Sequence, residues 1–147
     1  MTSPLPPPRS VLAIDFGTQK LGLAFGQSIT GTARPLDTLP VQGNQPHWPN
    51  LTAIIDQWNP DEIVVGLPLN MDGTESELCV FVRKFARRLQ ARVTQPVHLV
   101  DERLSSREAR ALQREMGSSP RRRNKPAHRV DALAAKYIAE SYLACLD

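Results

Sequence analysis

The chain has 147 residues, which suits a single domain with one substantial core. Its 41% hydrophobic and 22% charged residues are typical of a globular protein and exclude a disordered one. No apolar run approaches the roughly 18 residues of a membrane helix, and no signal peptide is visible. Cys79 and Cys145 form no C-x-x-C motif, so we expect a cytoplasmic protein whose thiols pack as small hydrophobic groups. Residues 1–10 predict a disordered Pro-rich leader, and residues 11–147 a single domain.

Charge is distributed unevenly along the chain. The formal net charge is only +3, but 14 of the 18 Lys and Arg residues lie between Arg83 and Arg129. Such asymmetry indicates a polyanionic partner, and nucleic acid is the one that we expect. The alternative is a set of solvated helix faces. The run RRRNK at residues 121–125 favours the nucleic-acid interpretation, because clustered like charges destabilise a compact surface unless something offsets them.

The first third of the chain predicts three strands. Residues 11–15 (VLAID) have the pattern of a buried strand. Residues 21–26 (LGLAFG) predict a second strand, joined to the first by a Gly-containing turn in a hairpin. Residues 32–39 predict a third strand, which Pro35 places at a sheet edge.

Helices and strands alternate in the middle of the chain. After Pro46 to Pro49, apolar residues spaced i, i+3, i+4, i+7 predict a helix that ends at Asn59-Pro60. Residues 62–66 (EIVVG) predict a buried strand. Thr74 and Glu77 have the spacing of a capping box, and the helix that they open carries an apolar stripe to Leu89.

The last third predicts one strand and two helices. Residues 96–101 (PVHLVD) form the fifth expected strand. A second capping box, Ser105 with Glu108, predicts a helix to about Met116, and a basic loop follows over residues 117–126. The final helix is expected over residues 127–146. The order βββαβαβαα predicts an α/β fold with a mixed five-stranded sheet flanked by helices.

Three acidic residues fall where a ligand site is expected. Asp15 ends the first strand, Glu102 follows the last strand, and Asp131 opens the final helix. Ligands of α/β sheets gather at the carboxyl ends of parallel strands, so these carboxylates can converge if the first and last strands are parallel. Oxygen-only ligands suit Mg²⁺ or Mn²⁺. A pair of such ions about 4 Å apart can activate a water and stabilise the leaving oxygen of a phosphodiester.

Each acid also has a simpler interpretation. Asp15 can cap a turn through its side chain, Asp131 can be a helix-start acid favoured by the macrodipole, and Glu102 can pair with Arg103 or Arg107. Taken jointly, with the basic cluster beside them, the simpler interpretations require three coincidences.

Other candidates are weaker when taken singly. The segment GLPLNMDGT (residues 66–74) can offer backbone N–H groups to an anion, or it is an ordinary loop with a turn at Asp72-Gly73. Lys20 can contact phosphate or be a plain hairpin charge. His98, inside a strand, is more typical of a core or surface residue than of a ligand. Trp48 and Trp58 are expected in the core.

Five segments, taken in order, resemble a known family: AIDFGTQKLGLAFG, TARPL, IVVGLPLNMDGT, DERLSS and RVDALAA. They are similar to the YqgF (RuvX) family over roughly residues 11–143. The resemblance implies a ribonuclease H-like fold related to Holliday-junction resolvases. It also implies a metal-dependent nuclease that processes the 5′ end of pre-16S ribosomal RNA. Family members often carry Lys where this chain has Arg129, so the charge is kept but not the geometry.

The resemblance carries site roles to particular residues. It implies Mg²⁺ or Mn²⁺ held by Asp15, Glu102 and Asp131 as metal ligands and catalytic residues. Together with the charge pattern, we expect nucleic acid to contact Lys20, Arg103, Arg121, Arg122, Arg123, Lys125 and Arg129. Gly17, Thr18, Gly66 and Asn70 are candidates to approach a phosphate. The expected partners are pre-16S rRNA, ribosomal precursor particles or branched DNA. The alternatives left open are a junction resolvase with the same chemistry and a non-catalytic ribosome assembly factor that binds nucleic acid.

Overall fold

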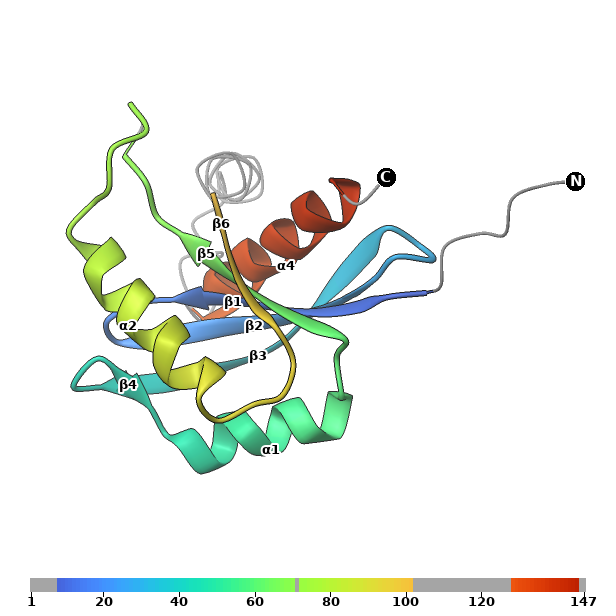
Figure 1. The fold of residues 1–147 in the computed structure, drawn as a ribbon, viewed down its shortest axis with the longest axis horizontal. Helices are drawn as coiled ribbons and strands as arrows, with labels where there is room; N and C mark the ends of the chain where they lie inside the picture. The colour runs from blue at the N-terminus through green and yellow to red at the C-terminus, as the bar shows by residue number, and fades with distance from the viewer. Residues whose placement is uncertain (1–7, 71, 102–127, 146–147) are drawn as a thin grey trace, which may run out of the picture.

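The computed structural model describes residues 8–70, 72–101 and 128–145, with side chains described from Ala132 onward in the last segment (Figure 1). Its strands are β1 (Ser10–Phe16), β2 (Lys20–Gln27), β3 (Thr32–Gln42), β4 (Gln45–Pro46), β5 (Glu62–Leu67) and β6 (Val97–Asp101). Its helices are α1 (Trp48–Trp58), α2 (Leu78–Gln90) and α4 (His128–Ala144). None of the helices in these described ranges is long and apolar enough to cross a membrane.

The strands form one mixed sheet in the order β4-β3-β2-β1-β5-β6. Strands β1 to β4 pair antiparallel along the chain, whereas β1 pairs parallel with β5 and β5 parallel with β6. The mixed sheet and the β1–β2 hairpin are confirmed. Pro35 lies in β3, which only the short β4 flanks on its outer side.

The sheet has six strands in place of the predicted five. The additional strand, β4, pairs Gln45 with Gln42 across a two-residue turn in which Gly43 and Asn44 have φ of 58° and 62°. Positive φ at both central residues is typical of a tight hairpin turn, which glycine and asparagine tolerate best. Strand β4 could not be predicted from the sequence, because two residues are too few to show an alternating pattern.

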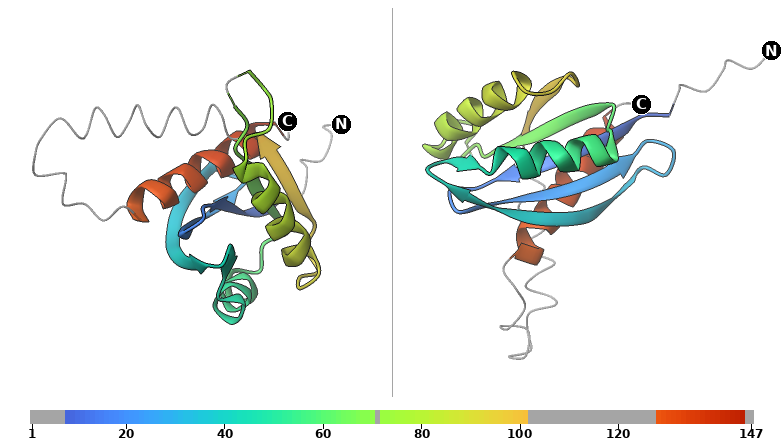
Figure 2. Two further views of the ribbon diagram at one scale, coloured as in Figure 1. Left: turned by 90° about the vertical axis from the view of Figure 1, so that its left-hand side faces the viewer. Right: turned by 90° about the horizontal axis from the view of Figure 1, so that it is seen from below.

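The helices cover both faces of the sheet (Figure 2). Helices α1 and α2 pack on the face that carries Leu12, Ile14 and Phe16 of β1. Helix α4 packs on the opposite face, which carries Val11 and Ala13. Because side chains alternate along a strand, each position of β1 can be assigned to one of these two faces.

Small residues bring α4 close to the sheet. Ala135 and Ala139 of α4 are fully buried. A Cβ added at Gly26 of β2 would meet Leu143 of α4 at 3.0 Å and Ala33 of β3 at 3.1 Å. Gly26 therefore leaves the space that the end of α4 fills.

A buried carboxylate lies at the start of β5. Glu62 is 3% exposed and accepts a hydrogen bond of 2.5 Å from the Tyr142 hydroxyl of α4. The Arg9 guanidinium pairs with the same carboxylate, and His98 Nε2 lies 3.3 Å from it. Burial and then the hydrogen bond to Glu62 raise the pKa of Tyr142 to about 12. This cluster joins the chain before β1 to β5, β6 and α4.

The N-terminal boundary differs from the expected one by a few residues. Ser10, expected in the leader, is the first residue of β1, and its backbone N–H donates to Asp61 at 2.8 Å. Residues 1–7 lie outside the described ranges.

Two local predictions are wrong. The capping box at Thr74 and Glu77 does not form: α2 begins at Leu78 without a side-chain cap. The Thr74 hydroxyl instead donates to Asp72 at 2.6 Å.

Cys79 is buried as expected, but Cys145 is exposed. The helix expected over residues 105–116 and the basic loop over residues 117–126 lie outside the described residues.

Candidate functional site

The parallel strands β1, β5 and β6 end at one edge of the sheet, and Asp15 lies at this edge. It is the next-to-last residue of β1, and Asp101 is the last residue of β6. The condition for convergence, that the first and last long strands are parallel, is met, with β5 between them. The Asp15 side chain is half-buried, and strand alternation places it on the α4 face beside Ala13.

Asp15 lies between two glycines. Gly22 of β2 is its direct antiparallel partner. On the other side, Ile14 pairs with Val65, so Gly66 of β5 lies level with Asp15. Alternation puts both glycines on the α4 face, as Leu21, Leu23, Val65 and Leu67 all belong to the opposite core. The two strand positions level with Asp15 thus carry no side chain, and Lys20 of β2, two residues before Gly22, lies on the same face of the sheet.

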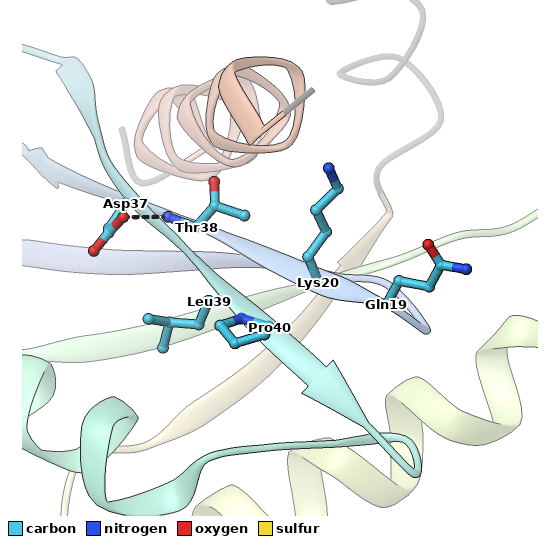
Figure 3. Close-up of a pocket in the computed structure, with 6 residues that line it drawn as sticks. All are labelled: Gln19, Lys20, Asp37, Thr38, Leu39 and Pro40. Atoms are coloured by element: carbon cyan, nitrogen blue, oxygen red, sulfur yellow. Dashed lines mark hydrogen bonds between the residues drawn. The ribbon is translucent and has the colours of Figure 1, made fainter. Parts of the chain in front are cut away.

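Thr38 of β3 lies next in line across the sheet. It pairs with Gly22, which in turn pairs with Asp15. Thr38 lines an open hollow of about 420 Å³ at the β1–β2 hairpin, together with Gln19, Lys20, Asp37, Leu39 and Pro40. In Figure 3 the side chains of Lys20 and Thr38 point to the side of the sheet on which α4 lies. The backbone N–H of Thr38 donates to the Asp37 carboxylate at 2.7 Å. The hollow thus presents an ammonium group and a hydroxyl group near the edge that carries Asp15.

The β1–β2 hairpin explains why residue 17 is a glycine. Its N–H donates to the Lys20 carbonyl at 3.0 Å, and an added Cβ would lie 2.7 Å from that carbonyl oxygen. The Gly17 N–H is therefore already engaged and does not face a phosphate. Thr18 is exposed at the tip of the same turn.

In the loop after β5, which was a candidate anion site, N–H groups donate hydrogen bonds to other residues of the same loop. Asn70 N–H donates to the Thr74 carbonyl, and its side-chain amide donates to the Thr74 hydroxyl at 3.0 Å. Gly73 N–H donates to the Asn70 carbonyl, and Thr74 N–H to Asp72 at 3.0 Å. These N–H groups are engaged within the turn, so the interpretation as an ordinary loop fits better.

The remaining predicted site residues divide into two groups. Asp131 and Arg129 lie in the first turn of α4, where the structure gives the backbone but not these side chains. Outside the described residues lie Glu102, Arg103, Arg121, Arg122, Arg123 and Lys125. Within the described part of the chain no three His, Cys, Asp or Glu residues form a metal-binding cluster. The described ranges thus contain one of the three expected ligand side chains, Asp15.

His98 and the tryptophans are structural. His98 is 43% exposed, lies beside Glu62 and stacks on Tyr142. Trp48 packs against Phe85 with ring centroids 5.6 Å apart. Trp48 is thus partly buried against the core, as expected. Trp58 is half-buried and belongs to neither described core cluster; it contacts the Phe25 ring at 4.9 Å and the Arg34 guanidinium at 4.8 Å.

Comparison with known proteins identifies the family. Residues 9–145 match the RuvX family, which is described as a Holliday junction resolvase. This chain is a member of the RuvX family.

Similar RuvX proteins carry one functional name. A protein of Saccharophagus degradans is 47% identical over 134 residues, covering 91% of this chain and 92% of its own. A protein of Escherichia coli O1:K1 is 50% identical over 133 residues, covering 90% and 94%. Both are named "Putative pre-16S rRNA nuclease".

Solved structures confirm the fold. Thermus thermophilus RuvC, solved with a Holliday junction substrate, matches with a TM-score of 0.55 at 17% identity, covering 94% of this chain and 96% of its own. The yeast mitochondrial Holliday junction resolvase Ydc2 matches with a TM-score of 0.54 at 11% identity, covering 96% and 80%. The ribonuclease H-like architecture expected of a RuvX chain is therefore present.

Two residues beside Asp15 in the candidate site were not predicted from the sequence. Gly22 and Thr38 lie far from Asp15 in sequence and reach it only through strand register. The signal available was the alternation of LGLAFG, whose glycines fall on one face. Pairing with Asp15 was not readable from that segment.

Proposed function

We propose that this chain is a divalent-metal-dependent endonuclease that matures the 5′ end of pre-16S ribosomal RNA in the cytoplasm. The observation that carries the proposal is the Asp15 carboxylate, which lies level with Gly22 and Gly66 at the carboxyl edge of the parallel strands. The names of relatives that share about half of its residues support the substrate. In this proposal pre-16S rRNA, free or in a ribosomal precursor particle, is the partner.

The residues of the proposed site fit Mg²⁺ or Mn²⁺. Carboxylate oxygens are the donors that these ions prefer, and the strand positions level with Asp15 are glycines, which add no side chain beside it. In the proposal Asp15, Glu102 and Asp131 hold the ion. When bound, it would supply positive charge to activate a water and to stabilise the leaving oxygen of the phosphodiester.

The chain's own side chains bind and orient the RNA. Lys20 supplies a positive charge and Thr38 a hydroxyl group to a phosphate at the hollow beside β2. Orientation of the scissile phosphate toward Asp15 lowers the entropic part of the barrier. The basic residues between Arg103 and Arg129 bind flanking phosphates and make affinity salt-dependent.

The test is cleavage of a pre-16S 5′-leader RNA with Mn²⁺ and with EDTA. We expect metal-dependent cleavage by the wild-type chain and a loss of about a hundredfold or more in Asp15→Asn, which keeps the size of the side chain but not its charge. Asp56→Asn is the matched control, because Asp56 is exposed on α1 on the other face of the sheet. Undiminished cleavage by Asp15→Asn would show that Asp15 is not catalytic.

A second substrate class is favoured by the description of the family, which is that of a junction resolvase. A four-way DNA junction is therefore a parallel substrate in the same assay. Cleavage of the junction alone would replace the RNA proposal with a resolvase. Binding of RNA without cleavage of either substrate would favour a non-catalytic assembly factor.

A further inference from the structure

Helix α2 and the turn that follows it concentrate positive charge away from the site at Asp15. Residues 83–92 carry five basic residues and no acidic one: Arg83, Lys84, Arg87, Arg88 and Arg92. All five are exposed. Like charges at i, i+4 destabilise an isolated helix, so this arrangement costs stability that an anionic partner would restore.

A groove follows this helix on one side. It lies between α2 and β6, which are side by side at the end of the sheet (Figure 2). Its volume is about 320 Å³, near the lower end of the roughly 300–1,000 Å³ of small-molecule sites. Its lining combines two cations and an amide with an apolar floor and contains no acid: Arg83, Ala86, Arg87, Gln90, Val97 and Leu99.

The two arginines of the groove differ in their contacts. Arg83 Nε donates to Glu75 at 2.6 Å, which fixes its guanidinium at the head of the groove. Arg87, one turn further along, has no acidic partner among the residues that the structure describes. Its charge therefore remains available to a bound anion.

We propose that the α2–β6 groove binds a single-stranded segment of the nucleic-acid substrate outside the cleavage site. Phosphates pair with Arg83 and Arg87, and an unpaired base lies on the apolar floor of Ala86, Val97 and Leu99. A duplex keeps its bases stacked inside, so it cannot use that floor. The groove thereby selects single strands, and it rests on the proposed function only for the identity of the nucleic acid.

The position of the groove connects it to the site. Leu99 lines the groove and lies two residues before Asp101, where β6 ends at the edge that carries Asp15. The two sites lie on opposite faces of the sheet, because Leu99 belongs to the core under α2 whereas Asp15 lies on the α4 face. A strand that passes around the end of β6 reaches both.

The test is binding of a labelled 12-nucleotide single-stranded RNA, and of a duplex of the same length, in EDTA over a range of salt. For Arg83→Gln/Arg87→Gln we expect affinity for the single strand to fall about tenfold at low salt. The slope of log K against log salt is negative, and its magnitude should decrease by about 1.4, which corresponds to two phosphate contacts. Affinity for the duplex should change less.

Two controls separate the groove from charge and from folding. Arg34→Gln/Lys136→Gln removes the same charge from residues on β3 and α4, outside the groove, and should keep the wild-type slope. Glu75→Gln breaks the ion pair of Arg83 but keeps both cations, and should bind at least as tightly as the wild type. An unchanged slope in the groove variant, or an equal loss in the charge control, would overturn the proposal.

Failure of the groove is distinct from failure of the proposed function. If the groove variant binds and cleaves RNA like the wild type, only the groove is refuted. If the wild type cleaves no RNA while the groove variant still loses single-strand affinity, the groove stands and the proposed function is refuted.

Discussion

Asp15 shows why a single residue in this chain is best understood together with its cross-strand neighbours. Its place near a strand end follows from VLAID, but the residues level with it, Gly22 and Gly66, belong to the two neighbouring strands. Register between strands depends on the whole sheet, so this part of the site could not be predicted from local sequence.

A methyl group added beside Asp15 should therefore reduce activity without unfolding the chain. In Gly66→Ala the new Cβ lies on the α4 face level with the Asp15 carboxylate. We expect cleavage of the leader RNA to fall at least about tenfold, because displacements of about 1 Å at a reacting centre cost up to roughly a hundredfold. RNA affinity in EDTA and the thermal midpoint should change little. Wild-type cleavage would show that the space beside Asp15 is not used.

Tyr142 gives a pH-dependent prediction at the same scale. Burial and the bond to Glu62 raise its folded-state pKa from 10.0 to about 12. Between these values the unfolded chain loses the phenolic proton while the folded chain keeps it, so this stabilising contribution is present below pH 10 and is lost as pH rises toward 12.

The matching variant is Tyr142→Phe. At pH 7 it should lower the free energy of unfolding by about 2 kcal/mol, the worth of a hydrogen bond to a charged group. Between pH 10 and 12 the difference from the wild type should shrink. Urea denaturation at several pH values measures both effects, and a constant difference across that range would contradict the assignment.

Element boundaries were predicted well where a hydrophobic period is long and poorly where a single side chain decides. The strands β1, β2 and β5 and helix α2 follow their apolar patterns. The start of α2 did not follow the capping-box spacing, because Asn70 and Asp72 engage Thr74 in the preceding turn. Hydrogen bonds within the neighbouring loop thus occupy the side chain that the capping box requires.

The docking of α4 on the sheet gives a prediction for a whole element. Gly26 leaves space for Leu143 and Ala33, so Gly26→Val should overpack this contact and lower the free energy of unfolding by about 1–3 kcal/mol. Gln27→Val, one residue later in the same strand and exposed, is the control for strand propensity. Denaturant titration measures the free energy of unfolding of both variants. Equal values for Gly26→Val and Gln27→Val would show that α4 shifts to accept the larger side chain.

At the scale of the whole molecule, the order of elements predicted a mixed sheet with helices on it, and the structure confirms this. Convergence of the acids was conditional on parallel first and last strands, and the structure meets this condition through the parallel pairing of β1 with β5 and of β5 with β6. The positions of the Glu102 and Asp131 side chains stay predictions. The sequence pattern directed attention to the basic run at residues 121–125, whereas the described groove lies along α2, where two elements meet.

Metal binding at the edge that carries Asp15 should couple to the stability of the whole fold. A ligand that binds only the native state adds RT ln(1 + [L]/Kd), which is about 2.7 kcal/mol at a hundred times Kd. For a chain of this size we expect Mn²⁺ to raise the thermal midpoint by about 5–10 °C. Asp15→Asn should lose most of that increase, whereas Asp56→Asn should retain it because Asp56 is exposed on α1, across the sheet from Asp15. The measurement needs no RNA, so it tests the metal site independently of the substrate. An equal rise in the wild type and in Asp15→Asn would place the bound ion elsewhere and remove Asp15 from the ligand set.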